Sequence, residues 1–445
     1  MNTVIEKQKE ILVKIQKDIS ISYNNDLSKL VHFQEAINLP VQRWYPYREG
    51  YSIELVNYFI NKLEISGLVF DPFSGSGTTL LASRLMELKS IGCDVNPISV
   101  KVAEAENEDY SQKDIEDLNI VLEELKKISC NNREYSTNFE LKDKVFNKEI
   151  LNALLQLKEF ILAIKNDKIN NLIFIEWLSI IESVSNIKKE GNGIKYKNRK
   201  RTSSGYINID KNIWEKENFP EDKFDYVKNK LLDKLYLVRE DLNDNYGSCK
   251  YKPKIYCDSC LNIDKFIDEP IEFTFFSPPY CNCFDYFEIH KVELWMGDFV
   301  QNRDQFRKSR NRGFRSNTNS LKDKKIKYIN EELEELINLF EVEKLWNKKI
   351  PEVVRGYFDD MFTLLKSIYN KTQKGGYVGI VVGNSAYSGV IIPTDVLIAK
   401  IAKEIGYKVE ELIITRHLTT SSQQKAKLEE VKDYLRESVI LLRKE

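Results

Sequence analysis

Residues 68–97 read LVFDPFSGSGTTLLASRLMELKSIGCDVNP, and this stretch decides the fold. A short apolar run ends at Asp71 and is followed by a glycine-rich turn, an amphipathic segment and a second apolar run that ends at Asp94. The two apolar runs have the length and the flanking turn residues of strands, and the segment between them has helical periodicity. The stretch therefore predicts one βαβ unit.

Further apolar runs predict more strands of the same sheet. They lie at residues 252–258, 271–280 and 375–385 and in the RESVILLRK run near the C-terminus. Segments of helical periodicity separate them. Strands and helices in this order predict an α/β fold with a doubly wound, mostly parallel sheet.

The segment between the βαβ unit and the next predicted strand has a different composition. Residues 104–247 are rich in Leu, Ile, Lys, Glu and Asn and contain few glycines. Runs such as EILNALLQLKEFILAI have the period of helices that bury one face. We expect a helical insertion at residues 108–249.

Composition and charge restrict the class of protein. The 445 residues include 67 Lys and Arg against 68 Asp and Glu, for a formal charge of -1, so an anionic partner must be held by local basic patches. The N-terminus has no apolar signal-peptide region, and no apolar run approaches the roughly 20 residues that span a bilayer. Seven cysteines, an odd number, favour a reducing compartment. We expect a cytoplasmic protein without a membrane partner.

The glycine-rich turn, residues 71–79 (DPFSGSGTT), is a candidate ligand loop. Gly75 and Gly77 permit a tight turn and a close approach of the backbone to a ligand. The turn lacks the lysine of a P-loop and is not GxGxxG, so a ligand with a cationic amine suits it better than a triphosphate. Asp94, at the end of the next strand, can accept hydrogen bonds from both ribose hydroxyls. A plain tight turn without a ligand stays the alternative.

A second candidate site is Ser277-Pro278-Pro279-Tyr280, which follows the apolar strand. Two prolines remove two backbone donors and leave carbonyl acceptors beside a hydroxyl and an aromatic ring. An exocyclic amine could donate to Ser277 and to the Pro278 carbonyl while Tyr280 stacks on its ring. The alternative is a turn that only ends the strand.

With both motifs in view, the chain resembles the S-adenosylmethionine-dependent DNA amino-methyltransferases. DPFSGSGTT resembles the cofactor motif of that family, GCDVNP its ribose-binding motif, and SPPY its catalytic [DNS]PP[YFW] motif. Residues 43–56 resemble the element that closes over the methionine end of the cofactor, and residues 255–259 resemble the strand whose aspartate contacts the adenine. The resemblance implies a Rossmann-like methyltransferase fold with S-adenosyl-L-methionine as cofactor.

The resemblance also implies site residues and domain limits. The catalytic residues would be Ser277, Pro278, Pro279 and Tyr280, and the cofactor-binding residues would be Tyr45, Asp71, Phe73, Gly75, Gly77, Thr78, Asp94, Asn96, Asp258 and Ser259. The catalytic domain would comprise residues 43–107 and 250–445, preceded by an N-terminal helical segment (1–42) and interrupted by the insertion at 108–249 and a basic insertion at 301–350.

A serine before PPY is commoner in the N4-cytosine enzymes of that family than in the N6-adenine enzymes. The resemblance therefore implies transfer of methyl to N4 of cytosine in double-stranded DNA by base flipping, in a restriction-modification system with a cognate endonuclease as candidate partner. The alternatives are an N6-adenine DNA methyltransferase, an RNA amino-methyltransferase, and a non-catalytic nucleic-acid-binding subunit, against which the intact motifs argue.

Two basic segments, residues 187–201 and 303–327, concentrate positive charge in sequence that we expect to be poor in helix. On a chain of almost no net charge, these segments are where DNA phosphates should bind. The expected contacts are Lys195, Lys197, Arg199, Arg201, Arg307, Arg310, Arg312 and Arg315. The alternative is a pair of solvated loops without a ligand.

Metal binding is not expected. Cys257, Cys260, Cys281 and Cys283 could supply four thiolates, but both pairs overlap the methyltransferase motifs, and the usual spacing of a zinc site is missing. The three histidines are dispersed, and His290 is expected to be structural.

Overall fold

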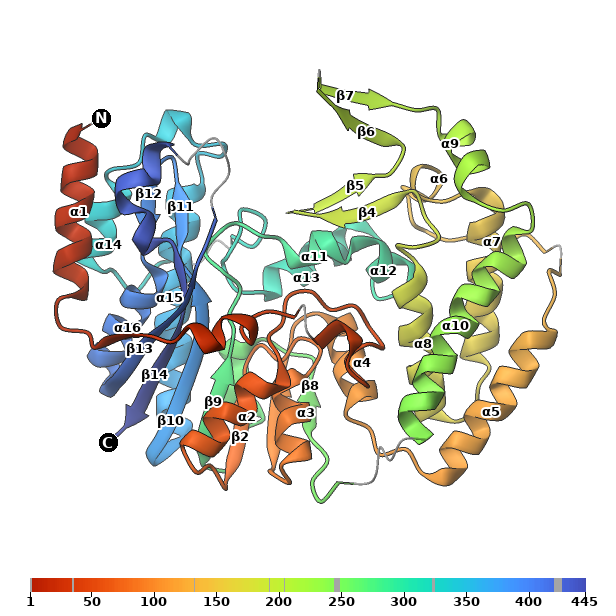
Figure 1. Cartoon of the computed structure of the whole chain (residues 1–445), viewed down its shortest axis with the longest axis horizontal. Coiled ribbons are helices and arrows are strands. Elements are labelled where there is room, and N and C mark those ends of the chain that lie inside the picture. Colours follow the sequence, from red (N-terminus) through yellow and green to blue (C-terminus); the bar gives the residue numbers. More distant parts are fainter. Residues whose placement is uncertain are drawn as a thin grey trace.

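The computed structural model describes residues 2–33, 36–131, 133–191, 193–203, 205–243, 249–321, 325–419 and 426–445. Figure 1 shows a sheet with its covering helices on one side of the molecule and the helices of residues 112–243 on the other.

Eight strands of the described residues form one sheet, in the order β1-β13-β14-β10-β9-β2-β3-β8. Their bounds are β1 Ile21–Tyr23, β2 Leu68–Asp71, β3 Ser90–Cys93, β8 Lys254–Tyr256, β9 Ile271–Phe276, β10 Thr372–Gly383, β13 Tyr407–His417 and β14 Arg436–Lys444. Among them only β14 runs antiparallel to its neighbours, β10 and β13. A parallel sheet with one reversed strand, here β14 between β10 and β13, is the Rossmann-like methyltransferase arrangement, so the predicted fold is confirmed.

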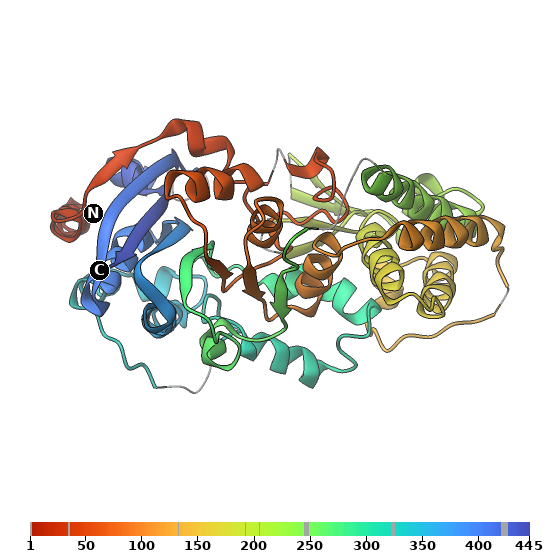
Figure 2. The same cartoon turned by 90° about the horizontal axis from the view of Figure 1, so that it is seen from below.

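Helices cover both faces of the sheet, as Figure 2 shows. On one face, α2 (Ile53–Lys62) and α3 (Thr78–Leu85) pack on Phe273, Phe275 and Val381. On the other face, α15 (Ile350–Lys371) and α16 (Thr394–Ile405) pack on Phe276, Ile380 and Ile440. Because successive side chains of a strand point to opposite faces, strands buried on both sides read as continuous apolar runs, as FTFF does.

The chain order places a switch point between β2 and β9. From β2 the chain continues outward to β3 and β8, whereas β9 is followed on its other side by β10. The carboxyl ends of β2 and β9 therefore flank a crevice at the sheet edge, which is where open α/β sheets bind ligands.

Residues 108–249 contain helices and also two β-hairpins that the sequence did not suggest. The helices are α5 Gln112–Lys127, α6 Lys142–Val145, α7 Lys148–Leu162, α8 Asp167–Ile180, α9 Lys211–Asn218 and α10 Lys223–Asn243. The hairpins are β4–β5 (Ile187–Glu190 and Gly193–Tyr196) and β6–β7 (Arg199–Thr202 and Gly205–Asn208). Figure 1 shows both hairpins at the top of the view, on the side of α11 and α13.

The remaining α-helices and strands are α1 Asn2–Gln16, α4 Pro97–Glu106, α11 Tyr286–Ile289, α12 Lys291–Met296, α13 Arg303–Arg312, α14 Glu331–Ile337 and the β11–β12 hairpin (Ser385–Tyr387 and Val390–Ile392). Helix α13 corrects the expectation that residues 303–327 are poor in helix. It forms because Asn302 caps its first turn, accepting a hydrogen bond from the Gln305 N–H, and because arginine and glutamine are good helix formers.

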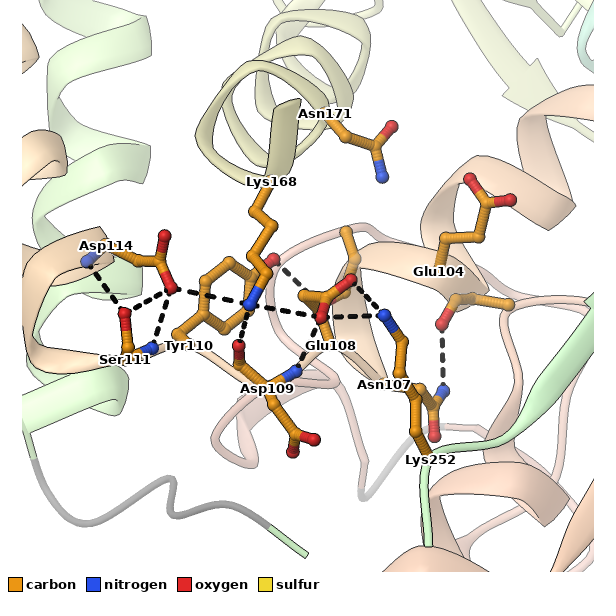
Figure 3. Close-up of polar contacts among 12 residues, drawn as sticks. Glu104, Asn107, Glu108, Asp109, Tyr110, Ser111, Asp114, Lys168, Asn171 and Lys252 are labelled. Carbon is orange, nitrogen blue, oxygen red and sulfur yellow. Dashed lines mark hydrogen bonds and ion pairs between the residues drawn. The ribbon is translucent and has the colours of Figure 1, made fainter. Parts of the chain in front are cut away.

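A polar cluster ties the insertion to the sheet (Figure 3). Lys168 of α8 lies 3.5 Å from Glu108 and 3.5 Å from Asp114, and Glu108 also pairs with Lys252, just before β8. Asp114 closes a capping box with Ser111 at the start of α5. The chain therefore leaves the sheet and returns to it at one charged junction.

Two buried carboxyls meet at the same boundary. Glu106 at the end of α4 and Glu176 of α8 are both almost inaccessible to solvent. Burial raises the pKa of Glu176 to about 8, although Lys234 lies 3.8 Å away. Burial and the neighbouring Glu176 raise the pKa of Glu106 well above its usual value.

This pair predicts a pH-dependent stability. Between the ordinary glutamate pKa of about 4.3 and the raised value of about 8, the folded state keeps a proton that the unfolded chain releases, so the free energy of unfolding should fall as pH rises. Glu176→Gln stays neutral in both states, so its free energy of unfolding should fall less between pH 5 and 9, by up to about 4 kcal/mol for one proton over about three pH units, and its thermal midpoint should decline by several degrees less than that of the wild type. The exposed Glu116→Gln is the control. A variant as pH-sensitive as the wild type would contradict the assignment.

Candidate functional site

A cavity of about 320 Å³ opens at the carboxyl ends of β2, β3 and β9. Segments far apart in the sequence line it: residues 47–51, residues 72–76 and Thr78 of the glycine-rich turn, Asp94 to Asn96, Ser259, the SPPY motif, Gly313, Phe314, Ser316, Asn317, Ser320, Arg416 and Glu437. The structure therefore brings both predicted motifs to one hollow.

The glycine-rich turn has the backbone geometry that requires glycine. Gly75 and Gly77 have φ of 51° and 91°, in the left-handed region. A Cβ on Gly75 would lie 3.0 Å from the Tyr47 ring, and one on Gly77 would lie 2.9 Å from the Ala103 Cβ. The turn is thus packed between the segment before β2 and helix α4, with its Gly75, Ser76 and Thr78 facing the cavity.

Asp71 lies beneath this turn, not in the cavity wall. It is 1% exposed, and its carboxylate accepts hydrogen bonds from the Phe73 N–H at 2.9 Å and the Tyr51 hydroxyl at 3.2 Å. Burial raises its pKa to about 7. Asp71 and Gly77 were expected to touch the cofactor, but their positions suit them to shaping the turn, because neither lines the cavity.

Asp94 does line the cavity. One carboxylate oxygen accepts a hydrogen bond from the Gly75 N–H at 3.1 Å, and the other accepts from the Asn96 N–H at 2.7 Å. Burial raises the pKa of Asp94 to about 6. A carboxylate oxygen has two lone pairs, so each oxygen can accept one more hydrogen bond from a ligand hydroxyl.

The SPPY motif follows β9, and all four of its residues line the cavity. The Tyr280 hydroxyl donates to Glu437 Oε1 at 2.5 Å, and Arg416 Nε donates to Glu437 Oε2 at 2.5 Å. A Cβ on Gly383 would lie 2.7 Å from the Tyr280 ring, so the ring rests directly on the backbone of β10. Burial and the Glu437 carboxylate raise the pKa of Tyr280 well above its usual value. The ring is therefore held in place before any substrate arrives.

Three aromatic side chains that the sequence did not single out, Tyr47, Phe284 and Tyr286, line the cavity. The positions of these three depend on loops whose course no periodicity reveals, so no local signal distinguishes them. Phe314 also lines the cavity and lies 5.5 Å from the expected Phe73 in an edge-to-face contact.

The expected Tyr45 does not reach the cavity. It is 2% exposed and lies against His290, whereas Tyr47, two residues later, stacks on the same histidine at 5.9 Å and faces the cavity. His290 is buried, and burial followed by the charge of Lys189 lowers its pKa well below the usual value. His290 therefore has the structural position expected of it.

Of the pair expected on the strand at residues 255–259, Ser259 lines the cavity and Asp258 does not. Asp258 accepts hydrogen bonds from the Asn262 side chain and the Ser259 N–H. Burial opposes its ionisation, but these hydrogen bonds and nearby positive charges hold its pKa below the usual range.

The arginines expected to bind phosphate between residues 303 and 327 are engaged with acidic or carbonyl groups. Arg307 pairs with Asp304, Arg310 with Asp285 and Glu288, and Arg312 with the Cys257 carbonyl and Asp258. For Arg315, the prediction of a phosphate contact is wrong. It is 2% exposed and bound to Asp359 and Asp360, so it has no surface to offer a phosphate.

The residues expected in the other basic segment lie on the two hairpins. Lys195 pairs with Glu190 in β4–β5. Lys197 donates to the backbone carbonyls of Glu182 and Ser185, and burial lowers its pKa. Arg199 and Arg201 are exposed on β6.

No helix in the described ranges is both long enough and apolar enough to cross a bilayer. Within those ranges, no three or more His, Cys, Asp or Glu side chains gather as metal ligands would.

Residues 49–105 match the family N6_N4_Mtase, described as DNA methylase. The chain is 29% identical to the type II methyltransferase M.BsoBI of Geobacillus stearothermophilus over 94% of this chain and 88% of that protein. It is 28% identical to the type II methyltransferase M.AvaI of Nostoc sp. over 87% of this chain and 83% of that protein.

Among solved structures, the rRNA methyltransferase aviRa from Streptomyces viridochromogenes aligns with 89% of this chain and 87% of that chain, with 8% identity and a TM-score of 0.28. The fold assignment rests on the strand order described above.

The similarities support a DNA amino-methyltransferase, and the family and the fold imply S-adenosylmethionine as methyl donor. The cavity residues fit that molecule. Asp94 has acceptor capacity for two ribose hydroxyls, and Phe73 and Phe314 offer aromatic surface for an adenine ring.

Asp94 generates a prediction for cofactor affinity. Removing a charge-assisted acceptor should weaken binding by about 1.5–3 kcal/mol, so Asp94→Asn should raise the Kd for S-adenosylmethionine roughly ten- to hundredfold. Protons compete with the cofactor for the carboxylate, so wild-type affinity should be steady above pH 7 and fall about tenfold per unit below the pKa of about 6. Calorimetric titration at several pH values measures both effects.

Asp71→Asn is the matched control, because it makes the same change at a second buried aspartate that lies under the turn. Its pH profile should follow the wild type, while that of Asp94→Asn should be flatter. An Asp94→Asn variant with wild-type affinity at pH 7.5 would remove Asp94 from the binding site.

Proposed function

We propose that this protein transfers a methyl group from S-adenosylmethionine to N4 of a cytosine that is flipped out of double-stranded DNA, within a restriction-modification system of the cytoplasm. One observation carries the proposal: the glycine-rich turn with Asp94 and the SPPY motif line the same cavity. Groups suited to the methyl donor and groups suited to an exocyclic amine are thus adjacent.

The chain's own residues would orient the amine. The bound cofactor supplies an electrophilic methyl group. The Ser277 hydroxyl and the Pro278 carbonyl are acceptors for the two N–H groups of an exocyclic amine, and both residues line the cavity. Two such hydrogen bonds favour a nitrogen whose lone pair points away from the ring plane. The gain is orientation and electrostatic stabilisation, and no strong base is needed before attack.

The aromatic wall would receive the base. A base inside a duplex must leave its stack, which costs a few kcal/mol, and stacking on Tyr280 offsets part of that cost. The Glu437 carboxylate fixes the Tyr280 hydroxyl, so the ring does not have to be ordered when the base arrives. Preorganisation of this kind lowers the entropy cost of binding.

Tyr280 and Glu437 give a kinetic prediction. Tyr280→Ala should lower kcat/KM on duplex DNA roughly ten- to hundredfold by loss of stacking. The loss should be smaller on DNA with a mismatched target base, because such a base costs less to unstack and unpair. Tyr280→Phe keeps the ring and loses only the hydrogen bond, so it should lose roughly three- to tenfold.

Steady-state methyl transfer on both substrates is the measurement, with cofactor affinity as the control that should not change. Equal losses on matched and mismatched DNA, or no loss in Tyr280→Ala, would contradict the stacking role.

The choice of cytosine rests on Ser277 and on the family resemblance of SPPY. Mass spectrometry of nucleosides from DNA treated with protein and cofactor should find N4-methylcytosine. Ser277→Ala should reduce it by about tenfold or more while keeping cofactor affinity, because one acceptor for the amine is lost.

Finding N6-methyladenine alone would reject cytosine and leave the cofactor and SPPY roles standing. Methylated RNA beside unmodified DNA would overturn the substrate class.

A further inference from the structure

The β6–β7 hairpin, residues 199–208 and hereafter the ribbon, is the most exposed regular structure of the insertion. Seven of its eight strand residues are exposed, and Thr202 is partly exposed. Tyr206 and Ile207 keep 51% and 52% of their surface. An isolated two-stranded hairpin is at best marginally stable in water, so such a ribbon needs either a partner or a firm base.

The base of the ribbon is firmly held. Asn198 donates from its side chain to the Ile209 carbonyl at 2.8 Å, and the Ile209 N–H donates to the Asn198 carbonyl at 2.9 Å, so one residue closes both strands. The Asn186 side chain donates a hydrogen bond to Asn198 Oδ1 at 3.0 Å and accepts one from the Asn198 backbone N–H at 3.0 Å. Asp210 then caps α9.

The neighbouring hairpin β4–β5 attaches this base to the cavity rim. Lys189 pairs with Glu293 of α12 at 2.6 Å, and both side chains are largely buried. Arg48, which lines the cavity, donates to the Lys189 carbonyl at 3.1 Å. The ribbon therefore has a fixed direction relative to the site of methyl transfer, although its strands touch little else.

The pairing register sorts the ribbon's side chains onto two faces. Arg199 is opposite Asn208, and Arg201 is opposite Tyr206. Paired residues share a face and alternate along a strand, so these four lie together. The Arg199 guanidinium lies 4.5 Å from the centre of the Tyr206 ring, which agrees with that assignment. Lys200, Thr202 and Ile207 lie on the opposite face.

The positive side chains of the ribbon differ from those of its neighbours because they are not held in ion pairs within the described residues. Lys188 and Lys195 of β4–β5 pair with Glu190, and the α13 arginines pair with acidic or carbonyl groups. Within the described residues, Arg199, Lys200 and Arg201 have no acidic partner. The face with Arg199, Arg201 and Asn208 carries the side chains that recognise base edges, because arginine pairs with guanine and asparagine with adenine in the major groove.

We propose that the ribbon enters the major groove of duplex DNA beside the flipped base and reads its sequence through Arg199, Arg201 and Asn208, with Lys200 on a phosphate. The inference rests on the proposed function and adds to it the element that sets sequence specificity. A major groove about 12 Å wide admits a two-stranded ribbon, whereas the deep, narrow major groove of duplex RNA does not.

The test selects bound molecules from a random-sequence duplex DNA library with the full-length protein. The wild type should enrich a short motif. Arg199→Ala, Arg201→Ala and Asn208→Ala should each enrich a motif that is degenerate at one or two positions, with roughly ten- to hundredfold less discrimination there. These side chains are exposed, so thermal midpoints should stay at the wild-type value.

Two controls carry similar charge changes. Lys200→Ala, on the opposite face, should keep the motif and reduce the slope of log binding constant against log salt by about 0.9. Arg307→Ala, on α13, should change neither the motif nor the slope. Retention of the full motif in all three reading-face variants, loss of it in Lys200→Ala, or equal binding of a duplex RNA library would overturn the proposal.

Methyl transfer to the same DNA separates the two ideas. A wild type that methylates DNA, with variants that keep its motif, contradicts the ribbon alone. A wild type that selects a motif through the ribbon but methylates no DNA contradicts the proposed activity alone.

Discussion

The hydrogen bond from the Gly75 N–H to the Asp94 carboxylate, 3.1 Å long, is the interaction on which the site depends. It joins the turn after β2 to the end of β3, and it requires the left-handed backbone of Gly75. The same backbone conformation places the glycine-rich turn against Tyr47, and a side chain on Gly75 would collide with the Tyr47 ring. The bond thereby holds the Asp94 carboxylate at the wall of the cavity that the aromatic side chains also line.

Burial then sets the electrostatics of the site. Asp71 and Asp94 have pKa values raised to about 7 and 6 because the sheet edge is shielded from water. Of the two, only Asp94 lines the cavity, so its ionised carboxylate favours a cationic ligand and its protonation should lower the affinity on acidification. On the other wall, the Tyr280 hydroxyl and Arg416 both bind the buried Glu437 carboxylate, so the tyrosine ring of SPPY is held in place by these two contacts.

Much of the fold followed from the sequence because its signals are local. The apolar runs before Asp71, Asp94 and Ser277 are strands in the structure, and the two motifs meet because the carboxyl ends of parallel strands share one edge. Placement of Tyr47 in the cavity in preference to Tyr45 was not predictable, because the segment before α2 has no periodicity. The pairing of Arg315 with Asp359 and Asp360 joins residues far apart in sequence, and charge patterns cannot reveal such burial. The hairpins were missed because their strands are only four residues long, and because the β6–β7 strands are exposed while β4–β5 buries only Ile187 and half-buries Ile194 and Tyr196.

The proposed reaction requires one cavity to hold the methyl donor and the target base side by side. A crystal structure of the protein with S-adenosylhomocysteine and a duplex containing its selected motif would show whether it does. We expect the ribose hydroxyls on Asp94 and an extrahelical base between Ser277 and the Tyr280 ring. A nucleoside bound elsewhere, or a target base still stacked in the duplex with Tyr280 facing solvent, would contradict it.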